Sequence, residues 1–429
     1  MGNENRSLWS IISSRAFIAR FLHMMFFDGV TKSFGVIVEP VVSQGDLPYR
    51  TVGWIFTWQL ASCYLATPFV TVLLRSEKTR LYATLAGFCV GLGYIGLAWT
   101  LNISLWLSLL MTSLSGAGLS ILLNVTVINL KTTFSDGSYA RAYAMSCLGT
   151  NFGIAVFPLI MSFLEELYGT TDGLSIFGAF LWNTAIVGLI TTTCSSGSSV
   201  DNSVGADYDD EEFNQVSHDD HQRWSSHFAI FFEQPPFIAF FVLSLLVETS
   251  FVAWAIYLVP YGESMGLEPN RAALLSTIGG TSGLLGKIFL AMVANFDSLH
   301  PLIVFTIPSL IIAFSYLTTF FWSDFAGLAT SSVMSGFCIG FQGSGRFTML
   351  GLVVSDEYFK SAVTWLYSGY ILSTLTGGIV AGFLRDISGN FQAVFGFLAV
   401  VCLLNAAISL LWILSTTKKG WKKSHSRGP

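Results

Sequence analysis

The polar stretch SSGSSVDNSVGADYDDEEFNQVSHDDHQRW, residues 195–224, interrupts a chain that is otherwise strongly apolar. It is rich in serine, aspartate and glutamate, and it has too few apolar side chains to bury a core of its own. We therefore expect a solvated linker over residues 195–227 rather than a folded domain. The linker divides the remaining sequence into two halves of similar length.

The composition places both halves in a lipid bilayer. Of the 429 residues, 52% are hydrophobic and only 11% are charged, with a mean hydropathy of +0.62. Soluble domains carry about 25% charged residues, and a helix that spans a bilayer needs about 20 predominantly apolar residues. Twelve such runs, six on each side of the linker, lie near residues 17–40, 52–74, 81–100, 104–129, 139–164, 173–194, 235–258, 270–294, 301–322, 326–354, 359–384 and 391–415.

These runs predict an all-α membrane protein built from two six-helix bundles. An even number of spans puts both termini on one side, and that side collects most of the 21 Lys and Arg residues, among them Arg20, Arg80 and Lys131. Because positively charged loops stay inside the cell, we expect cytoplasmic termini. The expected parts are a cytoplasmic N-terminus (1–16), an N-terminal bundle (17–194), the cytoplasmic linker (195–227), a C-terminal bundle (228–415) and a basic cytoplasmic tail (416–429).

Ionisable residues lie deep inside several of the apolar runs. A charge at that depth costs roughly 2.5–3.5 kcal/mol on insertion scales, so such residues usually face a protein interior or a water-filled path. Lys32, in the segment DGVTKSFGV, belongs to the first half, whereas Lys287 and Arg346 belong to the second. We expect these three cations to bind substrate, with Lys32 and Lys287 converging on a substrate carboxylate from opposite halves.

Asp28 and Glu248 are the clearest carboxylates within the spans. Asp28 lies four residues before Lys32, on the same helix face, and could pair with it. Glu248 could pair with Lys287 or Arg346, carry a coupled proton, or form a static salt bridge. Three cations against two carboxylates leave one positive charge in excess, which favours an anionic or zwitterionic substrate.

Aromatic side chains and the absence of catalytic motifs narrow the function further. Tyr367 and Tyr370 in the eleventh span could line a central cavity and select bulky substrates. The sequence contains no His-rich metal motif, no Ser/His/Asp arrangement and no phosphate-binding loop, so we expect neither an enzyme nor a cofactor or metal site. Nothing in the sequence indicates binding to nucleic acid.

Several short motifs resemble those of the monocarboxylate transporter family of the major facilitator superfamily. The first span carries Asp28-Gly29 and Lys32-Ser33-Phe34-Gly35-Val36, which are similar to the family's first helix. The eleventh span and the turn after it carry Ser361-Ala362-Val363, Gly377-Gly378 and Arg385-Asp386, again in the family's order. The resemblance extends over nearly the whole chain and implies two bundles with a substrate site between them near the midplane.

The eighth span departs from the family pattern. Proton-coupled lactate carriers have an Asp there and an Arg one turn later, whereas this chain has Lys287 preceded by only Ser282 and Gly283. Lys287 can replace the cation, but the carboxylate is missing, which argues against proton coupling by that pair. The resemblance also adds a single-span accessory glycoprotein, which some family members need for surface delivery, to the candidate partners.

Three hypotheses follow. The first is a secondary carrier in the plasma membrane that moves a small monocarboxylate, similar to lactate or pyruvate, by alternating access, with or without a proton. The second is a proton-independent facilitator of aromatic amino acids or similar hydrophobic molecules, which the missing carboxylate favours. The third is a non-transporting membrane sensor on a carrier scaffold, against which the charges within the spans argue.

Overall fold

The computed structural model describes residues 8–73, 78–134, 138–191, 229–293 and 302–417. The linker predicted at 195–227 and the outer parts of both termini lie outside these residues. Within the described ranges the regular elements are helices: α1 (Leu8–Ile12), α2 (Arg15–Gly45), α3 (Tyr49–Leu73), α4 (Thr79–Thr100), α5 (Leu105–Thr133), α6 (Tyr139–Ser146), α7 (Leu148–Leu181), α8 (Thr184–Ile190), α10 (Pro235–Ser264), α11 (Pro269–Val293), η3 (Leu302–Thr306), α12 (Ile307–Thr318), α13 (Phe325–Val353), α14 (Asp356–Leu375), η4 (Thr376–Val380), α15 (Ala381–Ser388) and α16 (Gln392–Thr417).

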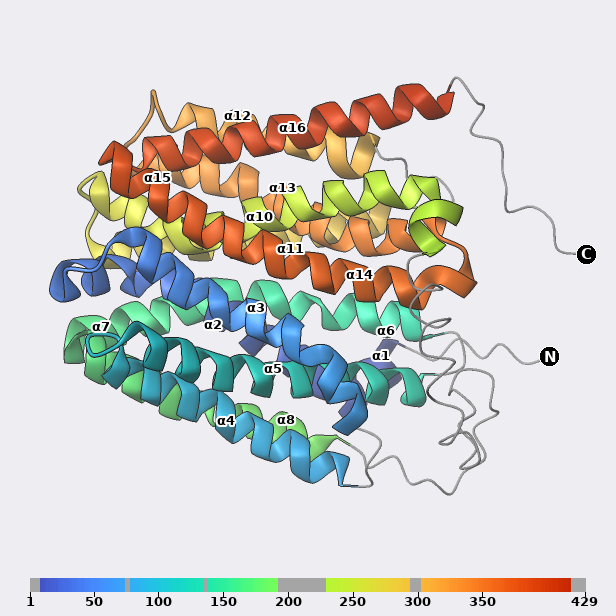
Figure 1. Ribbon diagram of the computed structural model, residues 1–429, viewed down its shortest axis with the longest axis horizontal. Helices are drawn as coiled ribbons and strands as arrows, with labels where there is room; N and C mark the ends of the chain where they lie inside the picture. Colours follow the sequence, from blue (N-terminus) through green and yellow to red (C-terminus); the bar gives the residue numbers. More distant parts are fainter. Residues whose placement is uncertain (1–7, 74–77, 135–137, 192–228, 294–301, 418–429) are drawn as a thin grey trace, which may run out of the picture.

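The helices form two bundles that lie side by side (Figure 1). Helices α2 to α8, blue to green, make the first bundle, and α10 to α16, yellow-green to red, make the second. Helix α2 begins and α16 ends at the same end of the molecule, which we call the terminal end. The turns between α2 and α3, α10 and α11, and α15 and α16 lie at the other end, which we call the opposite end.

The described helices confirm the twelve expected crossings. Eight stretches among the described residues are long and apolar enough to cross a membrane by length and composition. One of them, Arg141–Ile190, is 50 residues long and contains two crossings, because Gly169 has a left-handed φ of 75° that breaks the helix. Helices α3 and α13 have 25 and 29 residues, and α12 continues the short π-helix η3, so each of these also provides a crossing.

Close contact between glycines sets the spacing of neighbouring helices. A Cβ on Gly29 of α2 would lie 2.8 Å from the Gly153 Cα of α7, too near for any larger residue. In the second bundle, a Cβ on Gly340 of α13 would lie 2.1 Å from the Gly283 carbonyl oxygen of α11. Small residues permit this approach of backbones, which gives van der Waals contact where lipid supplies no hydrophobic driving force.

Buried polar side chains connect helices within each bundle. In the first, Gln59 accepts a hydrogen bond from the Tyr94 hydroxyl at 2.9 Å and donates to Ser115 at 2.9 Å. In the second, Asn405 accepts from Ser309 at 3.0 Å and donates to the Leu243 carbonyl at 2.8 Å. Satisfied polar pairs of this kind contribute about 0.6 kcal/mol each in a membrane, so they fix helix positions more than they add stability.

Candidate functional site

Three sets of helices join the two bundles. Helix α2 packs on α10, α3 packs on α14, η4 and α15, and α7 packs on α11. The charged residues predicted from the sequence lie on or beside these helices, between the terminal end and the opposite end. The interface between the bundles is therefore the candidate site.

Lys32 of α2 is buried against Trp254 of α10. Its ammonium donates a 3.0 Å hydrogen bond to the Trp254 carbonyl and lies 3.4 Å from the centroid of the indole ring. Lys32 is 0% and Trp254 1% exposed. Cation–π contacts that are removed from water are worth about 2 kcal/mol or more, so the two bundles meet here through a charged but solvent-free contact.

A row of hydrogen bonds joins helix α11 of the second bundle to α7 and the residue before it in the first. Lys287 donates to the Cys147 carbonyl at 2.8 Å, and Thr277 donates to the Ala155 carbonyl at 2.7 Å. Between them, Asn151 of α7 donates to the Gly280 carbonyl at 3.1 Å. The partner of the Lys287 ammonium is thus a neutral carbonyl of the other bundle rather than a carboxylate.

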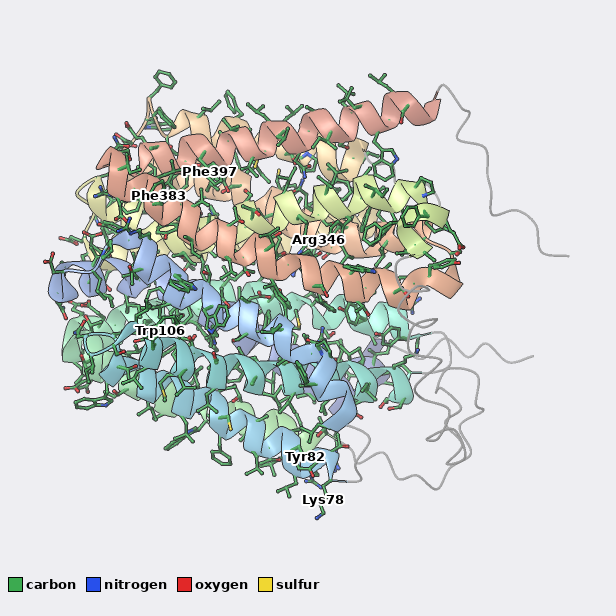
Figure 2. The ribbon with its side chains drawn as sticks, in the orientation of Figure 1. Lys78, Tyr82, Trp106, Arg346, Phe383 and Phe397 are labelled. Atoms are coloured by element: carbon green, nitrogen blue, oxygen red, sulfur yellow. The ribbon has the colours of Figure 1, made fainter. Side chains whose placement is uncertain are left out.

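Glu248 of α10 and Arg346 of α13 form an ion pair inside the second bundle. Arg346 Nη2 lies 2.7 Å from Glu248 Oε2, and the two side chains are only 11% and 4% exposed. The same guanidinium donates to the Ser244 carbonyl at 3.4 Å and lies 5.0 Å from the centre of the Tyr370 ring. Figure 2 shows Arg346 among the helices of the second bundle, whereas Lys78 projects from the edge of the first.

Asp28 lies near the middle of α2 and is only 9% exposed. Thr150 of α7 is its neighbouring hydroxyl, and Lys287, Glu248 and Arg346 of the second bundle lie within electrostatic reach of its carboxyl group. Asp28 therefore brings a carboxyl group from the first bundle to a cluster of charges that belongs to the second.

Three tyrosines meet between the bundles next to this cluster. The ring of Tyr64, on α3, stacks on Tyr367 of α14 with centroids 5.7 Å apart and lies 5.8 Å from Tyr370. Tyr370 is 1% exposed, and among the described residues its hydroxyl has no hydrogen-bond partner. A buried hydroxyl without a partner loses its hydrogen bonds to water, so a ligand group that reached it would restore one.

At the opposite end, Asp386 joins the second bundle to the first. Its carboxylate accepts hydrogen bonds from the backbone N–H of Tyr49 at 2.8 Å and of Arg50 at 3.1 Å, so it caps the first turn of α3. The guanidinium of Arg385 lies 4.7 Å from the ring centres of both Tyr49 and Phe391. A carboxylate at a helix N-terminus interacts favourably with the unpaired N–H groups and with the helix dipole. The bundles are thus held together at this end.

Arg20 is a buried cation that the sequence did not reveal. We expected it on the cytoplasmic side, but its side chain is 1% exposed and donates to Thr126 at 3.2 Å and to the Tyr143 hydroxyl at 3.4 Å. Arg20 sits in the second turn of α2, and a helix start gives no sign that its side chain turns inward. The other unforeseen group, Trp254, had a signal, because a tryptophan in mid-span is unusual when most lie at the membrane interfaces.

The structure brings some of the predicted residues together and separates others. Of the alternatives for Glu248, it forms the pair with Arg346. Tyr367 and Tyr370 lie beside that pair, as part of the three-tyrosine contact. Lys32 and Lys287 contact different helices of the partner bundles and do not share a ligand position in this conformation.

The pair that helix spacing suggested between Asp28 and Lys32 is not formed in this structure. The Lys32 ammonium instead takes the carbonyl and ring of Trp254. A carbonyl has two lone pairs and can accept a side-chain donor in addition to its helical N–H, and spacing on one helix cannot foresee such a partner on another.

Gly283 stands one turn before Lys287, where the family resemblance led us to seek a carboxylate, and the space beside it is filled by the Asn151 amide. A Cβ at Gly283 would lie 2.4 Å from the Asn151 amide nitrogen and 3.0 Å from the Gly336 carbonyl oxygen. A larger residue there would displace the Asn151 amide from this position and press on the Gly336 carbonyl.

The two six-helix bundles and the charged interface between them define the class of protein, a membrane transporter. The family model described as Major Facilitator Superfamily matches residues 10–322 and 299–429 of this chain. The chain therefore belongs to this superfamily. Members of this superfamily are transporters, so the chain is a transporter and not an enzyme.

Among its relatives, the chain is similar to monocarboxylate transporters. It is 21% identical to monocarboxylate transporter 4 of Gallus gallus, over 92% of this chain and 81% of that protein. It is 23% identical to monocarboxylate transporter 7 of Homo sapiens, over 92% of this chain and 85% of that protein. These relatives confirm the resemblance that the first and eleventh helices indicated.

Two solved structures share the fold. A D-xylose–proton symporter matches with a TM-score of 0.68 at 13% identity, over 92% of this chain and 96% of that one. A POT family transporter in complex with a thioalcohol-conjugated peptide matches with a TM-score of 0.70 at 14% identity, over 94% and 96%. At these identities the likeness concerns the arrangement of helices alone.

Proposed function

We propose that this transporter is a secondary carrier of a small monocarboxylate, similar to lactate or pyruvate, and that it works by alternating access. The observation that carries the proposal is the Lys287 ammonium, which lies between the bundles and contacts the neutral Cys147 carbonyl at 2.8 Å. A substrate carboxylate would be a stronger partner than that carbonyl, because hydrogen bonds between charged groups are roughly twice as strong as neutral ones.

The balance of buried charge supports an anionic substrate. Among the charged residues that the sequence predicted for the site, three are cations, Lys32, Lys287 and Arg346, and two are carboxylates, Asp28 and Glu248. The part-buried Glu39 and Glu263 lie closer to the opposite end, in the later turns of α2 and α10. One bound carboxylate would reduce this excess. It would therefore lower the cost of enclosing the charges in a low-dielectric interior when the bundles close.

Alternating access would exchange the contacts at the opposite end for contacts at the terminal end. In the present conformation the Asp386 cap of α3 holds the opposite end together, and the Lys32–Trp254 contact joins the bundles nearer the middle of α2 and α10. Opening that end would free the Lys32 ammonium, which could then meet a substrate carboxylate. With the terminal end cytoplasmic, as the distribution of Lys and Arg indicates, the opposite end faces outward, and we place the carrier in the plasma membrane.

Uptake into liposomes tests the proposal. Purified full-length carrier is reconstituted and offered labelled lactate, pyruvate and a panel of larger monocarboxylates. We expect saturable uptake of at least one acid by the wild type. Lys287→Gln should lower its rate at least about tenfold, equivalent to about 1.4 kcal/mol. The matched control is Lys131→Gln, at an exposed lysine in the last turn of α5. Equal loss in both variants, or none in Lys287→Gln, would contradict the role of Lys287.

A second candidate function has its own support in the tyrosine contact. Tyr64, Tyr367 and Tyr370 offer aromatic faces between the bundles, and aromatic rings prefer offset-stacked or edge-to-face partners. A proton-independent facilitator of aromatic amino acids or similar hydrophobic molecules would use them. The same liposomes distinguish the two: uptake of an aromatic amino acid that exceeds that of every short acid, and ignores a pH gradient, favours the facilitator. A chain that moves none of these solutes would point to the membrane sensor.

A further inference from the structure

We infer that Asp28 is the proton-binding carboxyl group of this carrier and that it works as the partner of Lys287 across the two bundles. The inference rests on the proposed function for its substrate, and it adds the site of the coupled proton.

Four of the charged side chains between the bundles fall into two unlike pairs. Glu248 and Arg346 are in direct contact at 2.7 Å, and both belong to the second bundle. That pair can stay intact whichever way the bundles tilt. Asp28 and Lys287 interact electrostatically but belong to different bundles, so their separation changes whenever the bundles move.

Lys287 has two alternative partners at the same interface. In this conformation its ammonium donates to the carbonyl of Cys147, the residue just before α7. Asp28, on the neighbouring helix α2, is the carboxyl group within its electrostatic reach. The Lys287 ammonium is thus bonded to the neutral Cys147 carbonyl while the Asp28 carboxyl group lies nearby. Lys287 can therefore bind a substrate carboxylate in place of that carbonyl.

Helix α11 carries no carboxylate of its own. The position one turn before Lys287 is Gly283, whose missing Cβ makes room for the Asn151 amide of α7. Asn151 in turn donates to the Gly280 carbonyl of α11. Any carboxyl group that serves Lys287 must therefore come from another helix, and α2 supplies it.

The proton and the substrate then balance in charge. When a substrate carboxylate engages Lys287, the Asp28 carboxylate would be left as an unpaired charge in a low-dielectric interior, which is costly. A proton from water on the same side binds Asp28 and removes that charge. One anion and one proton cross together with no net charge. Release of both on the other side leaves the Asp28 carboxylate facing Lys287 again.

The groups around Asp28 are compatible with this role. The ionisable groups of other helices that interact with it are Tyr64 of α3, Glu248 of α10, Lys287 of α11 and Arg346 of α13. From α7 it meets the Thr150 hydroxyl, which can donate to the carboxylate or accept from the protonated acid. On its own helix, Lys32 and His23 are the nearest ionisable residues along the sequence. Of the two carboxyl groups that interact with Lys287 and Arg346, Glu248 is held by Arg346, so Asp28 is the one left to exchange a proton.

Stability of the purified full-length protein tests the pair without any substrate. The set is wild type, Asp28→Asn, Lys287→Gln and the double variant, with Asp172→Asn as the control at an exposed carboxylate of α7. If the two groups interact, the change in Tm of the double variant differs from the sum of the two single changes. Additive changes would overturn the inference.

Proton movement tests the function. Liposomes that contain a pH-sensitive dye report protons that enter with an acid, while exchange of internal for external labelled acid reports movement of the substrate alone. In Asp28→Asn we expect the number of protons that enter with each acid molecule to fall at least about tenfold, equivalent to about 1.4 kcal/mol. The exchange of internal for external labelled acid should continue in this variant. Asp28→Glu should keep both, which also covers the case in which Asp28→Asn does not fold.

The outcomes separate the two proposals. Proton flux that persists in Asp28→Asn, or acid uptake by the wild type without protons, overturns the inference while the monocarboxylate carrier stands. A wild type that moves no monocarboxylate, but shows non-additive Tm changes, contradicts the proposed substrate while the charge pair stands.

Discussion

The Lys32 ammonium contacts Trp254 at two places at once, at the backbone carbonyl (3.0 Å) and over the face of the indole ring (3.4 Å). The lysine belongs to α2 and the tryptophan to α10, so this contact joins the two bundles. It also removes a positive charge from water, at a cost of several kcal/mol per ion. A cation–π contact of about 2 kcal/mol and one hydrogen bond offset only part of that cost.

The first prediction concerns that charge. Lys32→Met keeps an unbranched side chain but removes the ammonium, so we expect the Tm of the purified protein to stay level or rise. Transport should nevertheless fall at least about tenfold, equivalent to about 1.4 kcal/mol, because the charge serves the open conformation. Thermal unfolding and liposome uptake are measured on the same preparation. A fall in Tm with unchanged uptake would show that Lys32 is only structural.

The second prediction concerns the Glu248–Arg346 pair. Removing one partner of a buried ion pair costs about 3–5 kcal/mol, whereas replacing both can be nearly neutral. Glu248→Gln should therefore lower the Tm strongly, and the double variant Glu248→Gln/Arg346→Met should recover most of the loss. A double variant less stable than either single one would argue against a direct pair.

The third prediction concerns closure of the opposite end. Asp386 caps α3 from the other bundle, whereas Asp324 caps its own helix α13 through a 2.8 Å bond from the Gly327 N–H. Either change to alanine should cost about 1 kcal/mol of stability, as loss of a helix cap does. Only Asp386→Ala should also alter transport rates, because only that cap links the bundles. The comparison fails if both variants transport alike.

The fourth prediction concerns Gly283. An alanine there would place its Cβ 2.4 Å from the Asn151 amide, so Gly283→Ala should push α11 away from α7 and lower both Tm and uptake. Overpacking of this kind costs typically about 1–3 kcal/mol. Gly351→Ala in α13 is the control, since a Cβ there meets nothing within 4 Å, and we expect it to be neutral or stabilising.

The membrane-spanning helices could be predicted from the length of the apolar runs, because the thickness of a bilayer fixes how long each run must be. The run near 17–40 gave the first crossing, although helix α2 continues to Gly45 through Pro40. The charged candidate residues at the interface could be predicted from the sequence only by their charge. Asp28, Lys32, Glu248, Lys287 and Arg346 stood out because charge is rare at membrane depth.

Their partners could not be read from spacing along one chain. The i, i+4 rule suggested Lys32 with Asp28, but the contact with Trp254 depends on how α2 and α10 are set against each other. Arg20 was hidden for a similar reason, since its burial depends on α5 and α6 covering it. Such contacts across the sequence are fixed by packing between helices and not by local pattern.

The most direct test of the account asks whether the buried cations receive a carboxylate. The Tm of purified wild type and of Lys287→Gln is measured with increasing lactate or pyruvate, and with the neutral amide of the same acid. A ligand that binds the folded state raises the Tm. We predict that the acid raises the Tm of the wild type, that the amide does not, and that Lys287→Gln loses the response. An equal shift with the amide, or an unchanged response in Lys287→Gln, would contradict the account.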